Sequence, residues 1–338
     1  MPSDPTFTTY TPTQARTYAQ HRLSYPSKLY DTILNHHIST GGQLNVLVDV
    51  GCGPGRATRD LAAFFEVGIG LDPGEEMIRT ARAMSEEEGF KESGVREKVQ
   101  FAVCGAEDCA KGVREVLSTL KNGIDDGDSG EGRVDLLTAA MAAHWFSMPE
   151  FWDQAAEVVK PSGTVALWTC SSLYCHPSTP NAAAVQKALF HLEREVLAPY
   201  ELPQNRISRD MYDDLVLPWQ ATDPTTTAKG NLGEVFPESD FVRLEWDRNG
   251  TISDGSDFFL SSNSEKKGET TLNDLAGGLG TASMVTRWRE ANPELVGTDR
   301  DCVKEMCAEI RRAMGVSMDE NPTLKVAGSV VLLLFKRK

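Results

Sequence analysis

Two short apolar segments, each followed by a turn and a helical pattern, constrain the fold of this chain most strongly. Residues 44–50 are apolar apart from Asn45 and Asp49, and residues 67–72 are apolar or glycine before they end in Asp72. Short apolar runs that alternate with helical periodicity are typical of buried parallel strands joined by crossover helices. Because such crossovers are right-handed, the alternation predicts an α/β fold built on a parallel sheet.

The same patterns continue along the rest of the chain. Further strands are expected at residues 99–103, 134–139, 164–168, 241–246 and 326–335. Helices are expected at residues 14–37 with a break near Pro26, and at 56–65, 75–87, 149–159, 182–197, 272–290 and 299–314. The expected domains are N-terminal lid helices at 1–40, a core at 41–170, a substrate-side cap insertion with the sixth strand at 171–295, and a C-terminal helix and last strand at 296–338 that complete the sheet.

A glycine-rich turn joins the first expected strand to its helix. Gly51 and Gly53 can adopt positive φ and allow a ligand to approach the backbone, and the helix beyond presents unpaired N–H groups. Dinucleotide-binding turns have the spacing G-x-G-x-x-G, whereas this one has G-x-G-x-G and an acid, Asp49, two residues before the first glycine. A carboxylate there suits an ammonium group better than a phosphate. The combination indicates a nucleoside bearing an amino-acid cation, which is S-adenosylmethionine.

A second acid supports a nucleoside site. Asp72 ends the second expected strand, 21 residues after Gly51, where one helix fits between two neighbouring strands. A carboxylate at that position can accept hydrogen bonds from both ribose hydroxyls. The order strand, turn, helix, strand and acid therefore predicts the cofactor site.

The charge of the chain argues against two classes of partner. Lys and Arg number 34 against 49 Asp and Glu, so the net charge is −15, and the largest basic cluster is at 336–338. Nucleic acid and anionic membranes would be repelled by this field. The longest apolar run, 330–335, is far shorter than the roughly 20 residues of a membrane span. We expect a cytoplasmic protein with free thiols and no metal site. The acidic segment 122–132 is expected to be a surface loop, and the sequence leaves the oligomeric state open.

Four stretches resemble a known family. They are DVGCGPGRAT at 49–58, GLDPGEEMI at 70–78, the segment 142–168 that begins AAHWFSMPEF, and YAQHRLSYPSKLY at 18–30, with a weaker likeness at 271–288. On these residues the chain resembles class I S-adenosylmethionine-dependent methyltransferases, and more narrowly the fungal trans-aconitate methyltransferase group with its detoxifying relatives. The resemblance implies a Rossmann-like, seven-stranded, mostly parallel sheet with helices on both faces, an N-terminal helical lid and a helical insertion after the fifth strand.

The resemblance also implies roles for individual residues. His144 and Trp145 would lie at the substrate, His144 as a base or positioning group. Gly105 stands where many relatives have an aspartate at the adenine, which puts that contact in doubt. The residues that would surround the cofactor are Tyr18, Arg22, Asp49, Gly51, Gly53, Asp72, Pro73, Met77, Ala106, Glu107, Ala140 and Met141.

The predicted activity is methyl transfer to a small organic molecule by in-line displacement. The acceptor is a secondary metabolite, a toxin or an organic acid; carboxyl O-methylation of trans-aconitate and S-methylation of a thiol are the finer alternatives. A tricarboxylate would need guanidinium partners such as Arg22, Arg206 and Arg209. The net charge favours a neutral or thiol-bearing acceptor.

A non-catalytic regulatory protein is the alternative of another class. A nucleic-acid methyltransferase is disfavoured because AAHW follows the fourth strand. Further candidates for the pocket wall are Tyr174, His176, Tyr200, Trp219 and Trp288.

Overall fold

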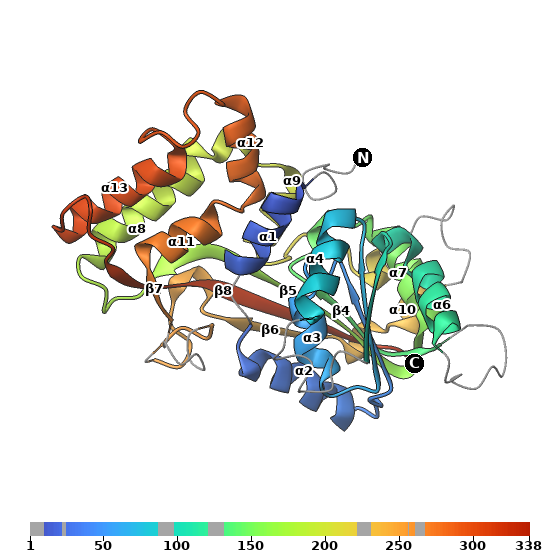
Figure 1. Cartoon of the computed structure of the whole chain (residues 1–338). Helices are drawn as coiled ribbons and strands as arrows, with labels where there is room; N and C mark the ends of the chain where they lie inside the picture. Colours follow the sequence, from blue (N-terminus) through green and yellow to red (C-terminus); the bar gives the residue numbers. More distant parts are fainter. Residues whose placement is uncertain are drawn as a thin grey trace.

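A computed structural model describes residues 10–21, 25–86, 98–120, 132–221, 231–255, 257–260 and 268–338. Figure 1 shows a twisted sheet with helices on both faces, and a second group of helices beyond one end of the sheet. The strands follow the order β3-β2-β1-β4-β5-β8-β6, and only β8 runs opposite to its neighbours. Their bounds are β1 Val46–Val50, β2 Val67–Asp72, β3 Val99–Val103, β4 Val134–Ala140, β5 Val159–Cys175, β6 Val242–Trp246 and β8 Thr323–Lys336.

This arrangement confirms the predicted Rossmann-like α/β fold. The strand count differs by one, because the three residues of β7 (Glu269–Thr271) pair with the beginning of β8. β7 contains no apolar side chain, so no hydrophobic pattern marked it. β5 is much longer than the strand predicted at 164–168. It also includes residues 159–163, where the register with β4 shifts and Ser162 has φ 65°.

The two faces of the sheet are covered by different helices. Val46, Val48 and Val50 of β1 pack beneath α6 and α7, whereas Leu47 points to the opposite face beneath α2 and α3. This alternation follows from the two-residue period of a strand. The helices of these layers are α2 Ser27–Ser39, α3 Arg56–Ala62, α4 Glu75–Ser85, α6 Cys109–Thr119, α7 Met148–Val158 and α10 Leu232–Val235.

A helical cap with its own apolar core lies beyond the carboxyl ends of the parallel strands (Figure 1). The predicted helix 272–290 is two helices, because Gly277, Gly278 and Gly280 weaken helical structure near the break. α13 packs against α8 in the cap. The predicted division of the chain into domains at 1–40, 41–170, 171–295 and 296–338 stays a prediction. The cap helices are α8 Ala182–His191, α9 Pro203–Arg209, α11 Leu272–Leu279, α12 Ser283–Ala291 and α13 Cys302–Met314.

The two predicted N-terminal helices form on either side of Pro26 and have different surroundings. α1 (Pro12–His21) contacts α4 of the core and α11 of the cap, whereas α2 packs on the sheet through Leu29 and Ile33. Of these two helices, α1 is the one that bridges the core and the cap. None of the helices in the described part of the chain is long and apolar enough to span a bilayer.

Candidate active site at the carboxyl ends of the strands

The glycine turn after β1 has the left-handed backbone that the sequence predicts. Gly51 has φ 67° and Gly53 has φ 54°. A Cβ on Gly51 would lie 2.5 Å from the Cβ of Ala142, whereas a Cβ on Gly53 would have no atom within 4 Å. Gly51 therefore allows close packing against the segment after β4, and Gly53 leaves its backbone open to a ligand.

Asp72 at the end of β2 connects this turn to the next one. Its side chain is 7% exposed; Oδ2 accepts a hydrogen bond from the Gly53 amide at 2.9 Å, and Oδ1 accepts one from the Gly74 amide at 2.8 Å. Burial raises the pKa of Asp72 to about 6. Because each carboxylate oxygen can accept more than one hydrogen bond, both oxygens retain capacity for ribose hydroxyls.

Asp49 occupies a more interior position than the sequence suggested. The carboxylate is fully buried, with Oδ2 accepting from the Thr58 hydroxyl at 2.7 Å and Oδ1 from the Thr138 hydroxyl at 2.8 Å. Burial raises its pKa to about 6, although both threonine hydrogen bonds oppose the shift. In this structure Asp49 links β1, α3 and β4, and its contact with an ammonium group stays a prediction.

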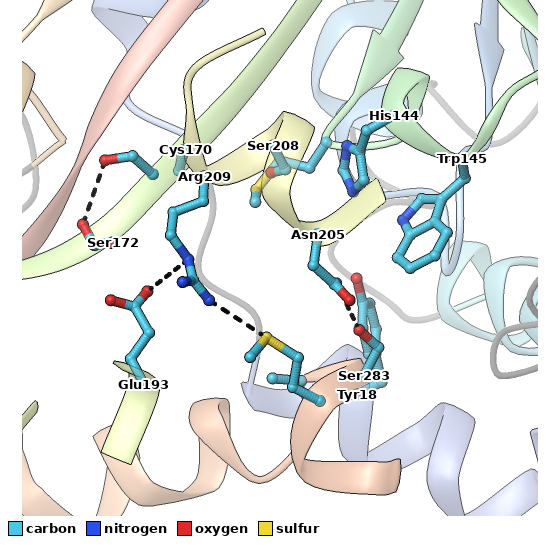
Figure 2. A pocket seen from close by; sticks show the side chains of 14 residues that line it. Tyr18, His144, Trp145, Cys170, Ser172, Glu193, Asn205, Ser208, Arg209 and Ser283 are labelled. Carbon is cyan, nitrogen blue, oxygen red and sulfur yellow. Dashed lines mark hydrogen bonds and ion pairs between the residues drawn. The ribbon is translucent and has the colours of Figure 1, made fainter. Parts of the chain in front are cut away.

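A cavity of about 180 Å³ begins beside the end of β4 and extends beneath the cap (Figure 2). Its wall combines aromatic rings, sulfur atoms, hydroxyl groups and one acid–base pair. The described residues that line it are Tyr18, Met141, His144, Trp145, Cys170, Ser171, Ser172, Glu193, Asn205, Ser208, Arg209, Ala282, Ser283 and Met284.

His144 lies where β4 gives way to a short 3₁₀ turn. The chain leaves β4 through Met141, which has φ 54°, and residues Ala143–Trp145 form the turn. His144 is 7% exposed, its ring centre is 5.1 Å from that of Trp145, and its Nδ1 is 3.2 Å from the Tyr212 hydroxyl oxygen. His144 and Trp145, which the sequence predicts at the substrate, therefore both lie at one wall of the cavity.

Comparison with known proteins identifies this part of the chain. The family model described as "Methyltransferase domain" matches residues 48–167, which run from within β1 to the middle of β5. Residues 48–167 are therefore similar to a methyltransferase domain, and they are called the methyltransferase domain for this likeness. The likeness supports a class I, S-adenosylmethionine-dependent type.

Two curated proteins are similar to the chain beyond this methyltransferase domain. A "Putative methyltransferase" of Dictyostelium discoideum is 23% identical over 201 residues, covering 60% of this chain and 63% of that protein. The "Probable S-adenosylmethionine-dependent methyltransferase CRG1" of Saccharomyces cerevisiae is 29% identical over 151 residues, covering 45% and 43%. The matches therefore span less than two thirds of these relatives.

A solved structure shares the fold of nearly the whole chain. The "Putative Type II Methyltransferase" from Anaeromyxobacter dehalogenans is 22% identical, with a TM-score of 0.55 over 94% of this chain and 97% of that one. At this identity the likeness concerns the fold alone, including the helices beyond the methyltransferase domain.

The residues of the methyltransferase domain fit S-adenosylmethionine at the turn after β1. The open backbone at Gly53 and the oriented carboxylate of Asp72 lie next to each other, joined by a hydrogen bond. Pro73 is exposed beside them, and Ala140 is half-buried at the end of β4. These groups would hold the nucleoside part of the cofactor.

The other residues predicted to surround the cofactor have different positions. Met77 is buried in a small cluster with Tyr18, which connects α4 to α1. Ala106 is buried in the core, whereas Glu107 is exposed and accepts a hydrogen bond from the Ser147 amide at 2.8 Å. Arg22 lies outside the described residues, as does nearly all of the acidic segment 122–132.

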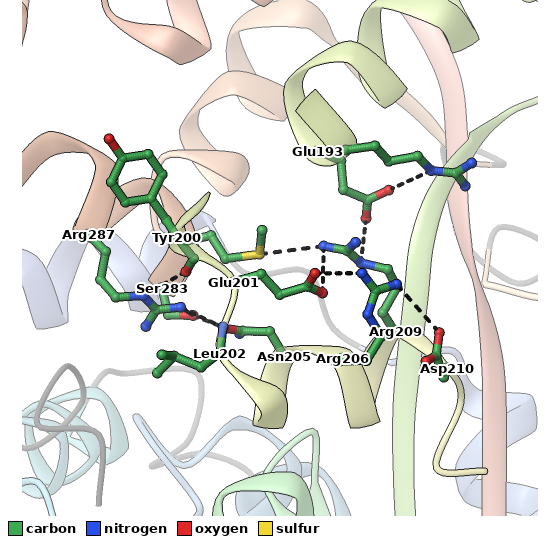
Figure 3. A network of polar contacts seen from close by, with 12 residues as sticks. Glu193, Tyr200, Glu201, Leu202, Asn205, Arg206, Arg209, Asp210, Ser283 and Arg287 are labelled. Atoms are coloured by element: carbon green, nitrogen blue, oxygen red, sulfur yellow. Dashed lines mark hydrogen bonds and ion pairs between the residues drawn. The ribbon is translucent and has the colours of Figure 1, made fainter. Parts of the chain in front are cut away.

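The cap wall of the cavity is a network of ion pairs that the sequence only partly indicated (Figure 3). The side chain of Arg209 is 12% exposed, with Nε 3.4 Å from Glu193 and Nη2 3.2 Å from Glu201. Arg206, three residues earlier, is 53% exposed and pairs with Glu201 at 2.6 Å and with Asp210 at 3.9 Å. Of the three predicted guanidinium groups, Arg22 lies outside the described residues and Arg206 is not among those that line the cavity. Arg209 lines the cavity, and two carboxylates already pair with it.

The remaining predicted wall residues contribute to packing elsewhere. Trp219 packs against Phe241 and Phe335, and Trp288 is buried in the core of the cap. Tyr174, His176 and Tyr200 are likewise not among the described residues that line the cavity. Sequence reasoning missed Glu193, Asn205 and the serines of the wall, because isolated polar residues on helices or at a strand end carry no signal that distinguishes a cavity from solvent.

Proposed function

We propose that this chain transfers a methyl group from S-adenosylmethionine to a small organic molecule bound in the cavity beneath the cap. The observation that carries the proposal is the position of the cavity, which begins at the end of β4 beside the cofactor turn. In open parallel sheets, ligands bind outside the carboxyl ends of the strands where the strand order reverses, and here that point lies between β1 and β4.

The chain's own residues would act mainly by holding two molecules in line. When bound, the cofactor supplies a methyl carbon made electrophilic by its sulfonium. Asp72 and the Gly53 backbone would fix the nucleoside, while the cap and α1 exclude water from the cavity. Such positioning is worth up to about 7–11 kcal/mol in favourable systems, so strong acid or base chemistry is not required for every acceptor.

The charge of the cavity wall bears on the acceptor. The two charged residues that the described part of the wall contributes are Glu193 and Arg209, and they pair with each other. A carboxyl group such as that of trans-aconitate would compete with Glu193 and Glu201 for Arg209. This competition favours an uncharged metabolite or toxin over a tricarboxylate, in keeping with the net charge of −15.

A screen with radiolabelled S-adenosylmethionine tests the proposal. Purified protein is incubated with small phenols, alcohols, thiols, amines and carboxylic acids, trans-aconitate included, and labelled product is extracted. We expect cofactor binding by calorimetry and turnover of at least one small acceptor class, with no transfer by the Asp72→Ala variant.

The outcomes separate the alternatives. Rapid turnover of trans-aconitate would replace the uncharged acceptor with the carboxyl substrate, and selective turnover of thiols would indicate S-methylation. Tight cofactor binding without transfer to any class would favour a regulatory protein. Absence of binding would contradict the nucleoside site itself.

A further inference from the structure

The imidazole of His144 is joined to a buried tyrosine behind the cavity wall. Tyr212 follows α9, has φ 60° and is 1% exposed. Its hydroxyl oxygen is 3.2 Å from Nδ1 of His144 and 3.5 Å from the carbonyl oxygen of Trp168 in β5. His144 lines the cavity (Figure 2), whereas Tyr212 is not among the described residues that line it. We therefore place the tyrosine on the side of the imidazole ring that faces away from the cavity.

The carbonyl oxygen of Trp168 can only accept a hydrogen bond, so we assign the phenol proton of Tyr212 to this contact. The direction of the contact between the phenol and Nδ1 then depends on the tautomer of His144. Burial raises the pKa of the Tyr212 phenol well above its ordinary value. The phenol therefore keeps its proton, and its oxygen is placed to accept one from Nδ1. In a neutral imidazole with a proton on Nδ1, the lone pair is on Nε2.

We infer that Tyr212 is a positioning residue that fixes His144 with its proton on Nδ1, so that Nε2 accepts a proton from the hydroxyl group of an alcohol or phenol being methylated. This inference rests on the proposed function and specifies its substrate class. A carboxylate or thiolate acceptor has no such proton to lose and would gain little from this arrangement.

The transfer balances in atoms and charge. The acceptor's O–H bond breaks and its proton passes to Nε2, while the oxygen's electron pair forms the new bond to the methyl carbon. The carbon–sulfur bond of the cofactor breaks, and its electron pair stays on sulfur. The positive charge lost from the sulfonium equals the charge gained by the imidazolium, which afterwards releases its proton to water.

The proton position can be measured without any substrate. Nitrogen-15 NMR of histidine-labelled protein distinguishes the two neutral tautomers, and the resonances of His144 are assigned by their loss in His144→Gln. We expect the proton on Nδ1 in the wild type and a changed tautomer balance in Tyr212→Phe. A matched control is Tyr30→Phe, which removes the hydrogen bond of a buried phenol to Asp60 on α3. The control should leave the His144 resonances unchanged.

Kinetics with a hydroxyl acceptor found in the screen test the coupling. His144→Gln should lower kcat about a hundredfold or more, and Tyr212→Phe about tenfold, with the cofactor dissociation constant unchanged in both. Because Tyr212 acts through His144, the double variant should be no slower than His144→Gln alone. Thiol and carboxylate acceptors should lose much less.

Three results would overturn the inference: a proton on Nε2 in the wild type, an unchanged tautomer in Tyr212→Phe, or single-variant losses that multiply in the double variant. A protein that binds cofactor but methylates nothing would refute the proposed function, and NMR would still determine the tautomer.

Discussion

The cofactor turn and the cavity wall meet at the end of β4 but are built in opposite ways. The turn is formed by residues 49–74, and its central hydrogen bonds join backbone amides to the carboxylate of Asp72. The wall is formed by segments scattered from Tyr18 to Met284, and ion pairs between their side chains hold its cap side together. A ligand site built from the backbone of one short segment tolerates few substitutions in that segment. A wall built from side chains of distant segments can be altered by substituting one side chain at a time.

Removal of the Asp72 carboxylate should have the largest effect of the changes predicted here, and it should act on cofactor affinity at the turn. Asp72→Ala removes the acceptor for the Gly53 and Gly74 amides and for two ribose hydroxyls. At about 1.5–3 kcal/mol for each hydrogen bond to a charged group, loss of the two ribose bonds weakens cofactor binding by roughly 10²–10⁴-fold. Isothermal titration calorimetry measures the change. Asp60→Ala on α3 is the control, because Asp60 is partly buried and bonded to Tyr30 but lies outside the turn. Equal affinities for wild type and Asp72→Ala would remove Asp72 from the site.

Substitutions in the cavity wall should lower the free energy of unfolding. Arg206 and Arg209 on α9 provide a matched pair of variants that test this. Arg209→Met leaves Glu193 and Glu201 with less charge compensation in a largely buried position, and should lower the free energy of unfolding by about 3 kcal/mol. Arg206→Met removes a cation that is 53% exposed and leaves Arg209 beside Glu201, so it should cost less than about 1 kcal/mol. Urea denaturation measures both values. Similar losses for the two variants would show that the wall does not depend on the buried cation.

The smallest predicted effect is a dependence of cofactor affinity on pH, which arises from Asp72 in the turn. The pKa of Asp72 is raised to about 6, so it is protonated below that pH and accepts hydrogen bonds from the ribose less well. Cofactor affinity should fall by up to about tenfold for each pH unit below 6. Stability without cofactor should change in the opposite direction. The folded state binds protons more tightly than an unfolded Asp with a pKa of 3.8, so the free energy of unfolding should decrease as pH rises from about 4 to 6.

Calorimetry and denaturation at a series of pH values measure these two trends. Asp72→Asn should flatten the affinity profile, with any residual slope assigned to Asp49, whose pKa is also raised to about 6. A wild-type affinity that is constant between pH 5 and 7 would contradict the predicted role of the Asp72 carboxylate.

The contrast also explains which features the sequence predicted. Strands β1 and β2, the glycine turn and Asp72 follow from local patterns, and all are in the predicted places. Helical periodicity placed Arg206 and Arg209 on one helix, but which of them faces the cavity depends on Glu193 and Glu201, which belong to other segments. Tyr212 gave no signal, because its left-handed backbone and its contact with His144 arise only in the tertiary structure.

The antiparallel pair of β5 and β8 has a mechanical consequence. Their pairing extends from Thr164 and Lys336 within the sheet to Cys175 and Val326 near the cap, and β7 adds to the far end of β8. The cap is thus joined to the sheet by a long antiparallel strand pair, whose register shifts once, between Cys170 and Leu173. Twisting it away from the sheet would break backbone hydrogen bonds in series, so the cap and the methyltransferase domain should melt in a single cooperative transition.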